Sequence, residues 1–147
     1  MFHGYEAKRK VASFGYDYDF NDRSISKSNT IPQDFQNIVT RVSQEIGLIS
    51  SEIEELLVTQ YHAGSVINWH RDAPPFKLIA GISLKSDCIF KLRPYAKAAQ
   101  TRKATLSFNV QASSLYIIQD EARTDFEHCI APVKKERYSL TFRTLNK

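Results

Sequence analysis

Apolar residues along this chain follow two spacings, and the change between them separates a helical segment from a series of strands. Ahead of residue 48 the apolar positions are three or four residues apart, which is the period of an amphipathic helix. These positions are Phe35, Ile38, Val39, Val42 and Ile46. Gly47 follows them, and glycine readily adopts the left-handed conformation that ends many helices. The pattern therefore predicts a helix from Pro32 to Gly47.

Later in the chain the pattern changes to short runs that are rich in β-branched and aromatic residues and are separated by turn-forming residues. The strands predicted from these runs are Leu56–Tyr61, Val66–Asp72, Leu78–Leu84, Cys88–Leu92, Ala104–Val110, Ser114–Ile118 and Tyr138–Thr144. One helix followed by many short strands is typical of a β-sandwich or barrel. We therefore predict a mainly β fold of the jelly-roll type, with a supporting helix.

Aromatic residues alternate with other residues in one further segment, close to the start of the chain. Phe14, Tyr16, Tyr18 and Phe20 are each two positions apart, so an extended backbone would carry all of them on one face. Such a face is suited to stacking against nucleobases. A strand that covers the core with its aromatic side produces the same pattern, and periodicity alone favours this second interpretation.

The composition is that of one ordinary domain. The chain has 147 residues, of which 42% are hydrophobic and 24% are charged, and this length is enough to enclose a single core. Since no Pro-, Gly- or Ser-rich linker divides it, we expect a single domain over residues 1–147. The net charge of +4 favours polyanionic partners only weakly, because a basic surface that aids solubility has the same balance.

Simple features of the sequence disfavour other classes of protein. No run approaches the ~20 apolar residues of a membrane-spanning helix, so we expect no membrane association. The first residues lack the basic start and apolar core of a signal peptide, and the chain's 2 cysteines are a poor basis for a disulfide framework. These features favour the reducing cytoplasm as the location of the protein.

His70, Asp72 and His128 form the pattern with the most chemical content. In an extended strand His70 and Asp72 project from the same face, because side chains alternate along a strand. His128, on another strand, would complete two imidazoles and one carboxylate, the ligand set that binds non-haem iron(II) and leaves coordination positions open. By itself this pattern is a weak match, since such spacings also arise by chance.

The predicted strand after His128 strengthens this interpretation, because its alternation is strict. One face carries Tyr138, Leu140 and Phe142, and the other carries Arg137, Ser139, Thr141 and Arg143. If the apolar face packs outward, the arginines point into the sandwich, where an unpaired positive charge is costly. A bound dicarboxylate satisfies them with bidentate hydrogen bonds. The alternative is a solvated edge strand, which the short distance to His128 disfavours.

Together these motifs resemble the AlkB-type dioxygenases, which oxidatively dealkylate nucleic acids. The resemblance follows the order His70-x-Asp72, then His128-x-x-x-Pro, then the strand from Arg137 to Arg143, and it extends over nearly the whole chain. It implies a double-stranded β-helix with Fe(II) held by the two histidines and the aspartate, 2-oxoglutarate as cosubstrate and O2 as oxidant. The implied activity is oxidative demethylation of N-alkylated bases in DNA or RNA, in the repair of alkylation damage.

The resemblance also implies roles for residues around the metal. The residues implied to hold the cosubstrate are Tyr61, Thr59, Arg137, Ser139 and Arg143. Residues 1–30 are similar to the substrate-side segment of short bacterial members, and we expect this segment to be N-terminally shortened. The residues expected to contact substrate are Tyr16, Tyr18, Lys8 and Arg9. The expected partner is an alkylated nucleic acid, single-stranded or with the base flipped out, bound by a monomer without an obligate protein partner.

Other functions are compatible with the same residues. A 2-oxoglutarate oxygenase that acts on protein or on a small molecule would keep the metal ligands and the arginines. A catalytically inactive relative that binds nucleic acid would keep the fold. A zinc hydrolase would use the metal ligands, but it leaves the paired arginines without a role.

Overall fold

The computed structural model describes residues 9–19, 21–27 and 29–146. Its strands are β1 (Arg9–Asp19), β2 (Ser24–Lys27), β3 (Glu55–Tyr61), β4 (Ile67–His70), β5 (Phe76–Leu84), β6 (Cys88–Pro94), β7 (Leu106–Val110), β8 (Leu115–Ile118), β9 (Phe126–Ile130) and β10 (Arg137–Leu145). Its helices are α1 (Gln36–Glu45) and α2 (Asp120–Thr124), and short 3-10 turns cover Gln33–Phe35, Ser50–Glu52, Lys97–Ala99 and Arg102–Ala104.

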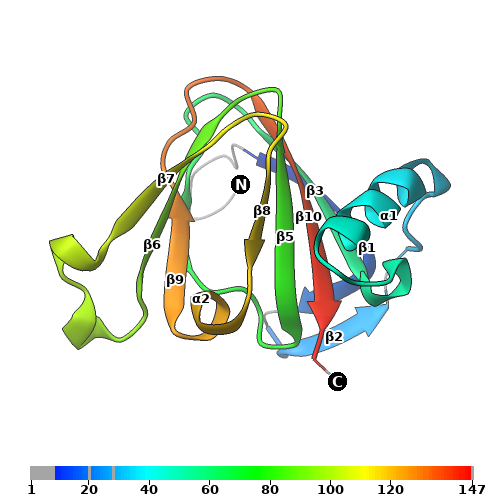
Figure 1. Cartoon of the computed structure of the whole chain (residues 1–147), viewed down its shortest axis with the longest axis horizontal. Coiled ribbons are helices and arrows are strands. Elements are labelled where there is room, and N and C mark those ends of the chain that lie inside the picture. Colours follow the sequence, from blue (N-terminus) through cyan, green and yellow to red (C-terminus); the bar gives the residue numbers. More distant parts are fainter. Residues whose placement is uncertain (1–8, 20, 28, 147) are drawn as a thin grey trace.

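The strands form two sheets that face each other (Figure 1). The large sheet has 6 strands in the order β2-β1-β3-β10-β5-β8, and the small sheet has 4 strands in the order β4-β9-β6-β7. All the paired neighbours are antiparallel. The predicted mainly β jelly roll, a double-stranded β-helix with a supporting helix, is confirmed.

The helix α1 covers the outer face of the large sheet (Figure 1). Val39 and Val42 of α1 are buried in one apolar cluster with Leu56 of β3 and with Leu140 and Phe142 of β10. This burial uses the apolar face of β10, so the opposite face of the strand must point between the sheets. The predicted alternation of β10 is therefore confirmed.

A second apolar cluster fills the space between the sheets. It joins Phe76 and Ile79 of β5 to Phe90 of β6 and Ile130 of β9. These residues come from both sheets, so the cluster is the interior of the jelly roll. The polar face of β10 enters this same interior, and the functional site is built there.

Gly15 changes the direction of β1. Its φ of +89° lies in the left-handed region, and a Cβ at this position would collide with the backbone carbonyl of Glu54. Up to Gly15 the strand β1 pairs with β3, and from Tyr16 onward it pairs with β2. Glycine is required at the point where the strand changes partner.

The bend at Gly15 corrects the prediction that the alternating aromatic residues share one face. Phe14 packs against Phe35 next to α1, with ring centroids 6.4 Å apart. Tyr18 instead packs against the cluster between the sheets. An ideal extended strand would keep both side chains on one side, but the left-handed residue between them rotates the second half of β1. Phe20 lies outside the described residues.

Several predicted boundaries are shifted in the structure. The predicted helix over residues 32–47 contains a 3-10 turn followed by α1, and Gly47 follows α1 with the expected positive φ of 75°. The predicted strand Val66–Asp72 starts at Ile67 and ends at His70, and Arg71 and Asp72 lie in the segment between β4 and β5. Neither the strand β2 nor the helix α2 was predicted, and β9 was expected only as the strand that carries His128, without bounds. All three are only four or five residues long, which is too short for a clear period.

The structure shows the lengths of the helices and the state of the two cysteines. Among the described residues no helix is long and apolar enough to cross a membrane. Cys88 and Cys129 are both buried as free thiols.

Candidate metal and cosubstrate site

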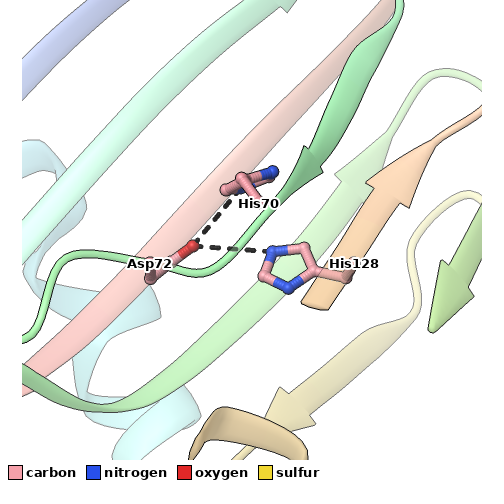
Figure 2. A group of neighbouring side chains, drawn as sticks. All are labelled: His70, Asp72 and His128. Carbon is pink, nitrogen blue, oxygen red and sulfur yellow. Dashed lines mark ion pairs between the residues drawn. The ribbon is translucent and has the colours of Figure 1, made fainter. Parts of the chain in front are cut away.

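His70, Asp72 and His128 come together between the sheets. His70 ends β4 and is the direct cross-strand partner of His128 on β9, so both side chains lie on one face of the small sheet. Asp72 lies just beyond β4, and its carboxylate points toward both rings (Figure 2). The nitrogen and oxygen atoms that these three residues can offer to a metal all lie within 4.8 Å of one another.

Each of the three side chains presents an atom suited to a metal. Asp72 Oδ1 lies 3.5 Å from His70 Nε2 and 3.5 Å from His128 Nε2 (Figure 2). His70 Nδ1 donates a hydrogen bond to the Asn68 carbonyl at 2.8 Å, which leaves Nε2 of the neutral ring free to bind a metal. The His128 ring stacks on Phe90 with centroids 5.2 Å apart, and this contact holds its orientation.

The charge state of Asp72 fits a metal ligand. Burial alone would raise the pKa of this carboxyl, but the charge of Arg143 and hydrogen bonds with His128 and His70 hold the pKa well below its usual value. Asp72 is therefore an anion in the folded protein, as a ligand of a divalent cation must be. Two imidazole nitrogens and one carboxylate oxygen are the donor set of non-haem iron(II) sites, and the residues present fit that ion.

Arg143 is paired with two carboxylates beside the candidate metal ligands. Its Nε donates to Asp72 Oδ2 at 2.8 Å, and its NH1 donates to Oε1 of the buried Glu55. Arg143 is also among the residues implied to hold 2-oxoglutarate, and its contact with the cosubstrate remains a prediction. In the structure these two nitrogens are already bound to carboxylates, so the direct contacts of Arg143 are with a candidate metal ligand and with Glu55.

Arg137 fits the expected role in cosubstrate binding. It is 0% exposed, and its Nε donates to Ser83 Oγ at 2.7 Å. Both of its terminal nitrogens are buried and have no hydrogen-bond partner among the described residues. A buried guanidinium left in this state is costly, and a carboxylate of a bound dicarboxylate would supply the missing acceptors in bidentate geometry.

The other residues implied to hold the cosubstrate surround Arg137. Tyr61 of β3 is the cross-strand partner of Arg137, and its ring centroid lies 5.0 Å from the guanidinium carbon. Thr59 is the partner of Ser139 in the same pair of strands, and both are buried. These side chains share the inner face of the large sheet, so the structure brings them together.

Sequence reasoning missed Ser83 and Tyr116, which also line this region. Gly81 of β5 lies opposite Tyr116 of β8, and a Cβ on Gly81 would collide with the Tyr116 phenol. Burial raises the pKa of Tyr116, while the positive charge of Arg137 acts in the other direction. A glycine inside a predicted strand is a signal of such close approach, and this signal could have located Tyr116.

A cavity of about 800 Å³ opens beside Asp72. Its lining combines aromatic and basic side chains, among them Tyr18, Tyr95, Arg23, Arg71 and Lys77. Arg71 is held in place, because its guanidinium carbon lies 3.5 Å from the Tyr95 ring centroid and its NH1 donates to the Thr124 carbonyl at 2.9 Å. The predicted substrate residue Tyr18 therefore reaches a cavity next to the candidate metal ligands.

Two further predicted substrate residues, Arg9 and Tyr16, do not line this cavity. Arg9 is exposed at the start of β1, opposite Tyr61, and Tyr16 is half-buried where β1 begins to pair with β2. Lys8 lies outside the described residues. Their contact with substrate remains a prediction.

The jelly roll, the His-Asp-His cluster and the buried arginine together define the class of non-haem iron oxygenases. The family model of the 2OG-Fe(II) oxygenase superfamily matches residues 3–143. The chain belongs to this superfamily, whose members are dioxygenases that use Fe(II), 2-oxoglutarate and O2. This match confirms the predicted family at the level of the superfamily.

Two individual proteins are similar to this chain, one in sequence and one in fold. The chain is 26% identical over 132 residues to "Uncharacterized protein L905" of Acanthamoeba polyphaga mimivirus, and the match covers 81% of this chain and 60% of that protein. The solved structure of OsALKBH1 is similar with a TM-score of 0.72 and 16% identity, over 96% of this chain and 82% of that one. This second similarity concerns the fold.

His70→Ala is expected to weaken Mn(II) binding by more than the roughly 10- to 100-fold that loss of an outer partner of a metal ligand costs, because it removes a direct ligand. Isothermal titration calorimetry with the metal-free protein measures this affinity. His62→Ala is the matched control, since His62 is exposed and outside the cluster. Equal Mn(II) affinity in the His70 variant and the unmodified protein would contradict the assignment of the ligands.

Arg137→Lys is expected to weaken 2-oxoglutarate binding to the Mn(II)-loaded protein by about tenfold or more, because an ammonium cannot reproduce the bidentate contact. The same variant should discriminate less between 2-oxoglutarate and 2-oxobutyrate, which lacks the distal carboxylate. Arg93→Lys is the control, since Arg93 is paired with Glu127. Undiminished 2-oxoglutarate affinity in Arg137→Lys would rule out this role.

Proposed function

We propose that this chain is an iron(II)- and 2-oxoglutarate-dependent dioxygenase that removes N-linked alkyl groups from the bases of DNA or RNA. The observation that carries the proposal is the fully buried Arg137, whose terminal nitrogens have no partner among the described residues. A dicarboxylate bound to this arginine enters the same interior that contains His70, Asp72 and His128. A zinc hydrolase would leave this arginine without a role.

The protein side of the proposed reaction is binding and orientation. When bound, iron(II), 2-oxoglutarate and O2 supply the oxidising chemistry, with succinate and carbon dioxide as by-products and a hydroxylated alkyl carbon as product. His70, Asp72 and His128 hold the metal, and Arg137 holds the distal carboxylate. Apolar residues of the interior exclude water from the reacting groups. The hydroxylated N-alkyl group is unstable and releases an aldehyde, which restores the base.

The cavity beside Asp72 supports a nucleic acid as the substrate. Aromatic side chains such as Tyr18 offer a flat surface for a base, and Arg71, Arg23 and Lys77 offer positive charge for phosphates. A base inside a duplex cannot reach a metal enclosed between two sheets, so the substrate nucleotide is single-stranded or flipped out. The net charge of +4 acts in the same direction.

A turnover experiment tests the proposal. The protein is incubated with iron(II), 2-oxoglutarate, ascorbate and air, with and without a single-stranded oligonucleotide that contains 1-methyladenine or 3-methylcytosine. We expect succinate and formaldehyde in equal amounts and only with the methylated strand. Succinate without stimulation by any strand would favour an oxygenase with a protein or small-molecule substrate. Strand binding without succinate would favour an inactive relative that binds nucleic acid.

Arg71→Ala is expected to weaken binding of a single-stranded oligonucleotide and to reduce the dependence of log affinity on log salt by about one unit, because one phosphate contact is lost. Fluorescence anisotropy at several salt concentrations measures both quantities. Arg41→Ala is the matched control, since Arg41 lies exposed on α1 in an ion pair with Glu45. An unchanged salt slope would remove Arg71 from the binding surface.

A further inference from the structure

Glu55 is a buried carboxylate that the proposed reaction leaves without a role. It begins β3, is 3% exposed and lies directly opposite Arg143 on β10. Its neighbour on the other side is Gly15 of β1, which brings no side chain against it. The register of the sheet therefore directs Glu55 toward Arg143, and Glu55 Oε1 accepts a hydrogen bond from Arg143 NH1.

Arg143 connects Glu55 to the candidate metal ligand Asp72. The guanidinium donates through Nε to Asp72 Oδ2 at 2.8 Å, while Asp72 Oδ1 is the oxygen that faces the two histidine rings. The side chains of Glu55 and Asp72 are 4% and 5% exposed, so water screens this pairing little. One arginine is thus shared by two carboxylates, and the Asp72 carboxylate has one oxygen directed away from the metal position.

The net charge of Asp72, Arg143 and Glu55 indicates a role for Glu55. Asp72 and Arg143 alone form a neutral pair, which attracts a further cation weakly and places a guanidinium charge close to it. Glu55 adds a second negative charge to the same buried group, so the three side chains together carry one net negative charge. A divalent ion is the largest charge in such a site, and its affinity depends on this sum.

We propose that Glu55 is a positioning residue of the metal centre. It neutralises Arg143 and holds it against Asp72 Oδ2, so that Oδ1 keeps both its direction and a net negative charge for a divalent cation. This inference rests on the proposed function, because it concerns the same metal ligands. Glu55 accepts a hydrogen bond from Arg143, and it acts on Asp72 through this arginine.

Mn(II) titration of the metal-free full chain by calorimetry tests this inference. Glu55→Gln keeps the size and polarity of the side chain but removes its charge, and we expect Mn(II) binding to weaken roughly 10- to 100-fold. Glu127→Gln is the matched control. Glu127 is also a buried carboxylate paired with an arginine, Arg93, and it alternates with His128 along β9, so it faces the other side of the strand. We expect its Mn(II) affinity to be unchanged.

A second variant separates charge balance from a simple packing role. In the double variant Glu55→Gln/Arg143→Gln the positive charge is removed as well, and Asp72 regains its own negative charge. We expect Mn(II) affinity to recover toward that of the unmodified protein. If Glu55 only stabilised the fold, the double variant would bind Mn(II) no better than the single variant. Circular dichroism checks that each variant folds. Glu55→Asp keeps the negative charge, and it replaces Glu55→Gln if that variant does not fold. We expect it to bind Mn(II) more tightly than a single variant with an uncharged side chain at this position.

The outcomes distinguish this inference from the function on which it rests. Equal Mn(II) affinity in Glu55→Gln and the unmodified protein, together with a large loss in His70→Ala, would overturn the role of Glu55 alone. Absence of Mn(II) binding in the unmodified protein would overturn both. A loss in Glu55→Gln that the double variant reverses supports the inference.

Discussion

The burial of guanidinium groups between the sheets is the constraint on which the rest of the structure depends. Because α1 covers the apolar face of β10, Arg137 and Arg143 must point into the interior. A buried charge without partners is costly, so each guanidinium group requires hydrogen-bond acceptors. Arg143 donates hydrogen bonds to Asp72 and Glu55, whereas the terminal nitrogens of Arg137 have no acceptor among the described residues. A single strand thus sets the orientation of a candidate metal ligand and creates the need for an anionic ligand.

Much of this arrangement could be predicted from local patterns. The alternation of β10 is a property of consecutive residues, and it correctly assigned Leu140 and Phe142 to one face and Arg137 to the other. The jelly-roll class followed from the number of short strands. The His-x-Asp spacing placed His70 and Asp72 near each other, although the strand ends at His70 and a loop, not the ideal alternation, carries the carboxylate.

The rest depends on contacts between residues far apart in the sequence. The bond from Arg143 to Asp72 joins positions 71 residues apart, and no periodicity contains that information. Glu55 looks like an ordinary polar residue at the start of a strand until the register places it opposite Arg143. The bend of β1 could not be predicted for a different reason: glycine permits the left-handed conformation but does not require it. Gly15 is needed because a Cβ there would collide with the backbone carbonyl of Glu54, and this contact is known only from the structure.

The change of partner at Gly15 has a consequence for the dynamics of the protein. Beyond this residue β1 pairs with β2, and among the described residues β2 pairs only with β1, so the cross-strand hydrogen bonds between these two segments are local. A unit of this kind opens at a lower free energy than strands enclosed on both sides, such as β3 and β10. Backbone amide hydrogens of β2 and of the second half of β1 should therefore exchange with solvent before those of β3 and β10. Tyr18 belongs to this pair of segments and lines the cavity beside Asp72, so this part of the cavity wall opens more readily than the strands that are paired on both sides.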